Sequence, residues 1–307
     1  MAVCRLMFRR LYVGAKAIDF TRPCNVIAYC HFSTMSKGIK QVPRKWPIPG
    51  IKHTVLLASG KGGVGKSTTA VNVAVALSRL AEKPVVGLLD ADIYGPSIPK
   101  MMNLSGQPQL SKQDKMIPLM NYGIKCMSMG FLVEERSAIV WRGLMVMSAV
   151  QKLLRGVDWG ELDVLVIDMP PGTGDAQLTI SEQIPVSGVV LVTTPQDIAL
   201  LDVRRGAEMF RQVNTPVIGV VQNMSAFVCP KCGHSSHIFG QDGGHKVARE
   251  IGAPILGDVP LDMVVREGSD SGQPVTIAQP DGDVSQSYGS IASQIWNKLL
   301  IDSTSRD

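Results

Sequence analysis

Glycines, lysines and hydroxyls are concentrated in one short stretch: Ser59, Gly60, Lys61, Gly62, Gly63, Val64, Gly65, Lys66, Ser67 and Thr68. Gly60 to Ser67 fit the pattern G-x-x-x-x-G-K-[ST], in which glycines let backbone N–H groups close around phosphate oxygens. We expect Lys66 to reach the β- and γ-phosphates and the Ser67 hydroxyl to bind Mg²⁺. The stretch therefore predicts a nucleotide site for ATP with Mg²⁺.

Asp168 follows the apolar run 164–167 and is the second candidate for holding Mg²⁺, through water. The next residues, 169–175, contain two prolines and two glycines, which indicate a shaped loop. A loop in this place is suited to sensing the γ-phosphate. A plain turn between a strand and a helix remains the structural alternative.

Asp90 and Asp92 follow the apolar run 85–89. One carboxylate is expected near the Mg²⁺ shell and the other beside the water that attacks the γ-phosphate. The alternative is that one of them caps a helix, and for Asp90 this alternative stays open.

Asn223 stands at the end of the apolar run 216–221. Its amide offers a donor and an acceptor in one plane, which suits the edge of an adenine ring. A cap at the end of a strand is the other interpretation.

Cys229 and Cys232 form a C-x-x-C motif that can give two thiolates to one metal. A structural zinc site takes four ligands, and His234 and His237 are candidates for the other two at a cramped spacing. Two copies of the motif across a dimer are the other route, and four thiolates suit a [4Fe–4S] cluster. A redox pair and two cysteines without a ligand are further alternatives.

The elements that must position these residues are apolar runs alternating with amphipathic segments. Expected strands are 55–58, 85–89, 164–167, 188–193, 216–221 and 254–257, with 124–129 as another candidate. Expected helices are 69–80, 144–154, 198–210, 243–251 and 290–300, and 103–122 is expected to be a surface excursion. Continuous apolar strands between helices predict an α/β fold, a P-loop NTPase with a mostly parallel, doubly wound sheet covered on both faces. The motifs fall at the carboxyl ends of strands, where such sheets bind ligands.

The N-terminal segment differs in composition from the rest of the chain. Residues 1–45 hold nine Lys/Arg and one acidic residue, whereas the other residues hold 22 basic and 25 acidic side chains. The charge thus argues against nucleic acid as a partner and is typical of a mitochondrial transit peptide, so we expect the mitochondrial matrix. The expected organisation is a transit peptide over 1–38, a linker over 39–53, one P-loop domain over 54–300 and a tail over 301–307. No stretch approaches the about 18 apolar residues of a spanning helix, which leaves at most a peripheral membrane association.

The second lysine of the glycine-rich stretch, Lys61, is either a solvated loop residue or a sign of a particular class. K-G-G-x-G-K-[ST] resembles the deviant phosphate loop of dimeric ATPases such as the septum-site and chromosome-partitioning enzymes. That resemblance implies a homodimer in which Lys61 reaches the nucleotide of the partner. It also implies the water-orienting role for Asp92 and the base-reading role for Asn223.

Further motifs make the resemblance more specific: L-D-A-D-I-Y-G-P-S-I-P, I-D-M-P-P-G-T-G-D, T-T-P-Q-D, V-Q-N-M-S and C-P-x-C-G-H. In this order, over roughly residues 50–270, they are similar to the Mrp/Nbp-type iron–sulfur carrier ATPases. The resemblance implies a labile [4Fe–4S] cluster held at a dimer interface by Cys229 and Cys232 and delivered to apo iron–sulfur proteins. With the transit-like N-terminus, it points to mitochondrial members that serve subunits of respiratory complex I.

Three other functions use the same features. A membrane-associated spatial regulator would need an amphipathic anchor, for which the stripe Ile291, Ile295, Trp296, Leu299 and Leu300 is the candidate, although docking on the core is favoured. An electron-transferring reductase similar to the nitrogenase iron protein would carry a cysteine in the loop after Asp168, which has none. A zinc-stabilised NTPase is the third.

Overall fold

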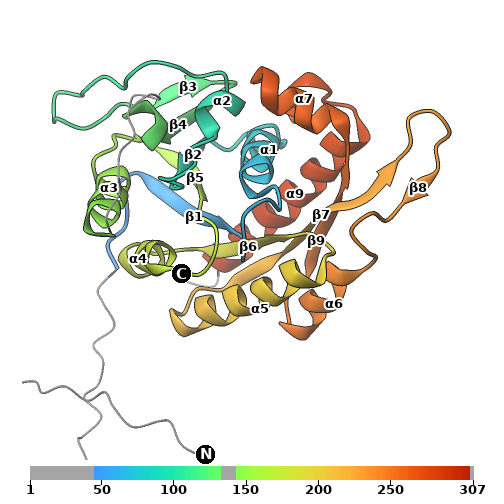
Figure 1. Ribbon diagram of the computed structural model, residues 1–307. Coiled ribbons are helices and arrows are strands. Elements are labelled where there is room, and N and C mark those ends of the chain that lie inside the picture. Colours follow the sequence, from blue (N-terminus) through green and yellow to red (C-terminus); the bar gives the residue numbers. More distant parts are fainter. Residues whose placement is uncertain (1–44, 133–142, 305–307) are drawn as a thin grey trace, which may run out of the picture. The chain divides into compact units, whose positions relative to one another are not determined.

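The computed structural model describes residues 45–132 and 143–304, which fall within one compact unit, residues 43–307 (Figure 1). The predicted transit peptide lies outside the described residues. Within this unit the alternation of apolar strands and helices produces one sheet with helices on both faces, as the sequence predicts.

The sheet has nine strands among the described residues, in the order β3-β4-β2-β5-β1-β6-β7-β8, with β9 also paired to β7. The strands are β1 (Ile51–Ala58), β2 (Val86–Asp90), β3 (Leu119–Asn121), β4 (Ile124–Ser128), β5 (Leu162–Asp168), β6 (Gly188–Thr193), β7 (Val217–Val228), β8 (Ser235–Ser236) and β9 (Ile255–Leu261). All pairs are parallel except β3 with β4 and β7 with β8. The prediction of a mostly parallel sheet is confirmed.

The sheet divides the core into two layers, because neighbouring residues of a strand point to opposite faces. Helices cover each layer. Leu56 belongs to one apolar cluster, with α3, α4, α5 and α6, and Leu57 to the other, with α1, α2, α8 and α9 (Figure 1). The helices are α1 (Lys66–Ser78), α2 (Ile98–Met101), α3 (Gly143–Arg155), α4 (Asp175–Gln183), α5 (Asp197–Gln212), α6 (Gly243–Glu250), α7 (Met263–Ser271), α8 (Val275–Ala278) and α9 (Asp283–Thr304).

Both predicted boundaries of the domain need correction. β1 begins at Ile51, inside the predicted linker 39–53, because Ile51 pairs with Leu162 on β5 and the nearby Ile48 is buried in the core. At the other end, α9 continues to Thr304, so the predicted tail 301–307 begins too early. In both places tertiary packing extends an element beyond its strongest apolar pattern.

The apolar stripe of α9 faces the core, apart from Leu300, which is exposed. Ile291, Ile295 and Leu299 are fully buried, Trp296 is nearly so, and α9 packs on α1 and β9. The stripe is therefore used for docking within the domain, as the sequence favours. Among the described residues, no helix combines the length and the hydropathy that crossing a bilayer requires.

The segment 103–122 is less of a surface excursion than predicted. Met116 is buried and bridges to Leu110 and Val157, and the segment ends in the edge strand β3. The sequence also gives no warning of α2, α4, α7 and α8. These short elements lack enough residues to show a helical period, and neighbouring elements fix them.

Candidate nucleotide site and cysteine hairpin

The glycine-rich stretch forms the loop between β1 and α1, and the N-terminus of a helix is a favourable place for an anion. Gly63 and Gly65 have φ angles of 83° and 80°, which residues with a side chain rarely adopt. A Cβ at Gly65 would also lie 2.2 Å from Asn223 Nδ2. The loop conformation thus depends on glycine at these positions.

Lys66 and Asp168 form a buried ion pair, with 2.5 Å between Lys66 Nζ and Asp168 Oδ1. Lys66 Nζ also lies 3.2 Å from the Ser67 hydroxyl oxygen. Burial raises the pKa of Asp168, while Lys66 opposes that rise. The structure therefore brings together three residues that the sequence predicts for phosphate and Mg²⁺.

The residues present fit a magnesium ion. Asp168 Oδ2 is buried and has no hydrogen-bond partner among the described residues, which is costly for an oxygen unless something else binds it. A carboxylate and a hydroxyl are oxygen ligands of the kind that Mg²⁺ prefers.

Asp90 lies beside Asp168 because β2 and β5 pair these two residues in register. Its side chain is fully buried and accepts hydrogen bonds from Ser97 N, Ile98 N and the Ser128 hydroxyl, at 3.0 to 3.3 Å. Burial and the Asp168 carboxylate raise the pKa of Asp90 to about 7. Asp90 therefore holds the start of α2 from the end of β2, although Ser97, and not Asp90, is the N-cap residue of that helix.

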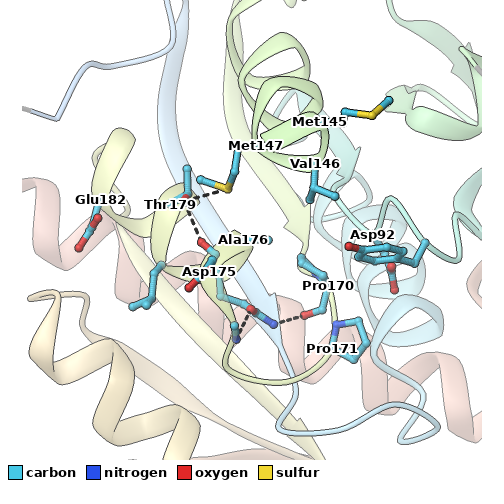
Figure 2. Close-up of a pocket in the computed structure, with 14 residues that line it drawn as sticks. Asp92, Met145, Val146, Met147, Pro170, Pro171, Asp175, Ala176, Thr179 and Glu182 are labelled. Atoms are coloured by element: carbon cyan, nitrogen blue, oxygen red, sulfur yellow. Dashed lines mark hydrogen bonds between the residues drawn. The ribbon is translucent and has the colours of Figure 1, made fainter. Parts of the chain in front are cut away.

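Asp92 is half-buried, and its Oδ1 accepts a hydrogen bond from Gly95 N at 3.3 Å. Figure 2 shows Asp92 at one side of a cavity of about 1070 Å³ that α3, α4 and the loop after β5 surround. Pro170 and Pro171 line the same cavity. Asp92 is thus a carboxylate with solvent access beside the loop predicted to sense the γ-phosphate.

Gln177 holds that loop in shape, although it is not among the residues that the sequence predicts for the site. Its Nε2 donates to Pro170 O at 2.7 Å and to Gly172 O at 2.9 Å, while Oε1 accepts from Gly174 N at 2.7 Å. A Gln three residues after the residue that caps a helix is a known capping signal that could have found it. Gly172 N also donates to Ser59 O at 3.0 Å, which ties the loop to the phosphate loop.

Asn223 is buried against the phosphate loop, where its Nδ2 donates to Val64 O at 2.9 Å. With Gly65, Thr68 and the turn Pro260–Asp262 it lines a cavity of about 220 Å³. Asn223 lies within β7, which continues to Val228, so it braces the loop and does not cap the end of the strand.

Cys229 and Cys232 lie at the tip of a hairpin that β7 and β8 form beyond the body of the sheet (Figure 1). Two backbone hydrogen bonds close the turn: Cys229 N donates to His234 O at 3.0 Å, and Gly233 N donates to Cys229 O at 2.9 Å. β7 is longer than predicted: it continues past Asn223 to Val228, with an irregular, left-handed residue at Met224. One strand thus carries both Asn223 and the cysteine turn.

Both cysteines are free, Cys232 is exposed, and Cys229 is partly so. Backbone N–H groups of Lys231 and Cys232, together with the Cys232 side chain, lower the pKa of Cys229. A lower pKa favours the thiolate, which is the form that binds metals.

The predicted mononuclear site with His234 and His237 is not formed. His237 Nδ1 lies 3.1 Å from Ser225 O, and no three metal-ligating side chains come together anywhere in 45–132 or 143–304. One chain therefore presents two thiols at the hairpin tip.

Comparison with known families decides the class of the protein. The model of the ParA family described as NUBPL iron-transfer P-loop NTPase matches residues 50–296. The chain belongs to this family. The resemblance predicted from the sequence motifs is confirmed.

Relatives in this NUBPL family span most of the chain. The iron–sulfur cluster transfer protein NUBPL of Mus musculus is 61% identical over 265 residues, 86% of this chain and 82% of that protein. The Arabidopsis thaliana protein named "Iron-sulfur protein required for NADH dehydrogenase, mitochondrial" is 53% identical over 264 residues, which are 86% of this chain and 83% of that protein. The iron–sulfur cluster carrier protein of Escherichia coli (strain K12) is 45% identical over 287 residues, which are 93% of this chain and 74% of that protein.

Solved structures agree with the fold. The nucleotide-binding protein of Archaeoglobus fulgidus, in complex with ADP, has a TM-score of 0.66 and 36% identity over 76% of this chain and 91% of that chain. The cell division ATPase MinD of Pyrococcus furiosus has a TM-score of 0.60 and 20% identity over 80% of this chain and 98% of that chain. At 20% identity the second likeness concerns the fold alone and does not favour a spatial regulator.

Proposed function

We propose that this NUBPL-family chain is an ATP-hydrolysing carrier that holds a [4Fe–4S] cluster between two copies of itself and delivers it to apo iron–sulfur proteins. The single observation that carries the proposal is the exposed pair Cys229 and Cys232, at the tip of a strand that also braces the phosphate loop through Asn223. Membership of a family described by iron transfer supports the same cargo.

In the proposed hydrolysis, Lys66 and the backbone of the glycine-rich loop, Gly60 to Thr68, hold the β- and γ-phosphates. Asp92 orients the water whose oxygen attacks the γ-phosphorus as the bond to the β-phosphate oxygen breaks. Ser67 and Asp168 would hold Mg²⁺, which supplies charge neutralisation on the phosphates. Asn223 faces the adenine edge with its Oδ1.

The homodimer rests on the surface beside the glycine-rich loop. The Lys61 ammonium has no ion-pair or hydrogen-bond partner among the described residues. Next to this loop, where Gly60 contacts Asp202, α5 exposes the apolar side chains Ile198 and Leu201. An unpaired cation and an apolar surface suit a face-to-face partner, in which Lys61 of the partner subunit reaches the γ-phosphate.

The recipients and the compartment follow from relatives. The Arabidopsis thaliana relative is described as required for mitochondrial NADH dehydrogenase, which supports complex I subunits as recipients. The basic, acid-poor residues 1–45 support import into the matrix. Protection from added protease inside intact, but not detergent-opened, mitochondria would test the compartment.

The decisive experiment is metal and sulfide analysis after anaerobic purification. Wild-type protein should contain iron and sulfide in equal amounts at four atoms of each for two chains, as a shared [4Fe–4S] cluster requires. Cys229→Ala and Cys232→Ala should each lose the cluster absorbance and still bind a fluorescent ATP analogue, whereas Cys126→Ala, in the core, should keep the cluster. Zinc in place of iron, or a cluster retained by the double cysteine variant, would refute the proposal.

A second measurement addresses the dimer and the ATPase. Lys61→Ala should keep nucleotide affinity and lose most of the hydrolysis rate, because its proposed target is the nucleotide of the other copy. Lys66→Ala should lose nucleotide affinity itself. Equal hydrolysis by wild type and Lys61→Ala would exclude the role of Lys61.

A further inference from the structure

A groove of about 470 Å³ runs along the cysteine hairpin, between the end of β7 and the start of α7. Pro230, which stands between the two cysteines in the motif, lines it. Anything bound in this groove would therefore lie against Val228 and Pro230, the two chain neighbours of Cys229.

The walls of the groove are apolar and open to solvent. Val228 is 52% exposed and Met263 is 56% exposed, although both are large apolar side chains. Phe227, Pro260, Leu261, Val264 and Val284 complete the apolar lining. Exposed apolar side chains gathered in a groove are typical of a binding surface.

The remaining lining residues are all acidic: Asp262, Glu267 and Asp283. Asp262 caps α7 by accepting from Val264 N at 2.9 Å, and Glu267 pairs with Arg266 at 3.0 Å. Asp262 and Asp283 have no cationic partner among the described residues. An apolar groove with a carboxylate rim is complementary to a segment that carries apolar and basic side chains.

The turn Pro260–Asp262 lines this groove on one side and the cavity beside Asn223 on the other. The groove and the proposed base site thus share a wall. A ligand in either place contacts the same three residues.

We infer that this groove is the docking surface for a basic, apolar segment of the recipient apoprotein, which it positions against the cluster cysteines. The inference rests on the proposed function, because the recipient has meaning only for a cluster carrier. It adds which surface receives the recipient and what chemistry the recipient must present.

The test uses the full-length, cluster-loaded protein and two labelled peptides, one built from Leu and Lys at helical spacing and one from Leu and Glu. Fluorescence anisotropy should show binding of the Leu/Lys peptide only. Glu267→Lys and Met263→Ser should each weaken that binding by about tenfold, as loss of a central contact does. Both side chains are exposed, so neither change disturbs the core.

Matched controls change the same residue types elsewhere on the surface. Glu208→Lys, on α5, and Met120→Ser, on β3, should leave peptide binding unchanged. Equal binding by all variants, or equal affinity for both peptides, would overturn the inference. A shift from dimer to monomer in Met263→Ser, measured by light scattering, would overturn it as well, since the groove would then be a contact between copies.

Cluster transfer to an apo complex I subunit supplies the functional measurement. Glu267→Lys and Met263→Ser should slow transfer several-fold with unchanged iron and sulfide content, and the two controls should not. Normal transfer by the groove variants would overturn the inference and leave the carrier function standing. Absence of a cluster in wild-type protein would instead refute the carrier function, and the peptide measurements would still judge the groove.

Discussion

Lys66 Nζ lies 2.5 Å from Asp168 Oδ1 inside the core, so the two residues that should serve phosphate and Mg²⁺ neutralise each other. Both side chains are buried, and a buried charge without a partner is strongly destabilising. In the proposed function, the phosphates would give Lys66 a second partner and Mg²⁺ would give Asp168 one.

The pair can be tested by a double-mutant cycle on nucleotide-free protein. Asp168→Ala leaves the Lys66 ammonium buried without its counter-charge and should lower the free energy of unfolding by about 3–5 kcal/mol. Lys66→Ala/Asp168→Ala should recover part of this loss. Urea unfolding measures both, and additive effects of the two single changes would contradict the pairing.

The buried Asp90 predicts a pH-dependent stability. Its pKa of about 7 lies above the ordinary value of 3.8, so between these pH values the folded chain binds a proton that the unfolded chain has released. The free energy of unfolding should therefore fall as pH rises from about 4 to about 7. Burial raises the pKa of Asp168 too, which acts in the same direction.

Asp90→Asn should flatten this dependence, measured by urea unfolding across the same pH range with EDTA and without nucleotide. The exposed Asp158→Asn serves as the control and should keep the wild-type slope. A wild-type slope in Asp90→Asn would show that Asp90 does not titrate in this window.

Two glycines of the phosphate loop should respond differently to alanine. Gly65→Ala meets both a φ of 80° and Asn223 Nδ2, so nucleotide binding should be lost. A Cβ at Gly62 would have no protein atom within 4 Å, and Gly62→Ala should keep more affinity than Gly65→Ala. Titration with a fluorescent ATP analogue measures both, and similar affinities would contradict the geometry.

Gln177 is expected to act as a positioning residue for hydrolysis. Gln177→Ala removes three hydrogen bonds that hold the loop between Pro170 and Gly174, which should lower kcat about tenfold with little change in KM. A kcat equal to that of wild type would mean that the loop keeps its shape without Gln177.

The C-terminal helix should matter for stability and not for membranes. Ile291 is fully buried, and Ile291→Ala should destabilise the fold by about 2–4 kcal/mol. The exposed Ile301→Ala should cost far less. The protein should not co-sediment with vesicles in the presence of ATP or of ADP. Co-sedimentation that depends on ATP would support the spatial-regulator function instead.

The sequence alone determines those features whose physics is local. A glycine-rich stretch between a strand and a helix specifies a phosphate loop, because φ above zero and helix N–H groups are properties of a few consecutive residues. Apolar strands likewise specify a parallel sheet and place Asp168 and Asn223 at its carboxyl edge. The motif C-x-x-C predicts a metal ligand pair, but not what completes it.

Only the tertiary structure decides which distant groups meet. It separates Asp90, which holds the start of α2, from Asp92, which reaches an open cavity, although the two lie two residues apart. It places Asn223 within β7 and Cys229 directly after that strand, because pairing with β9 and β8 extends β7 past its apolar run. Contacts between segments far apart in the chain carry that information, and no short stretch of sequence records it.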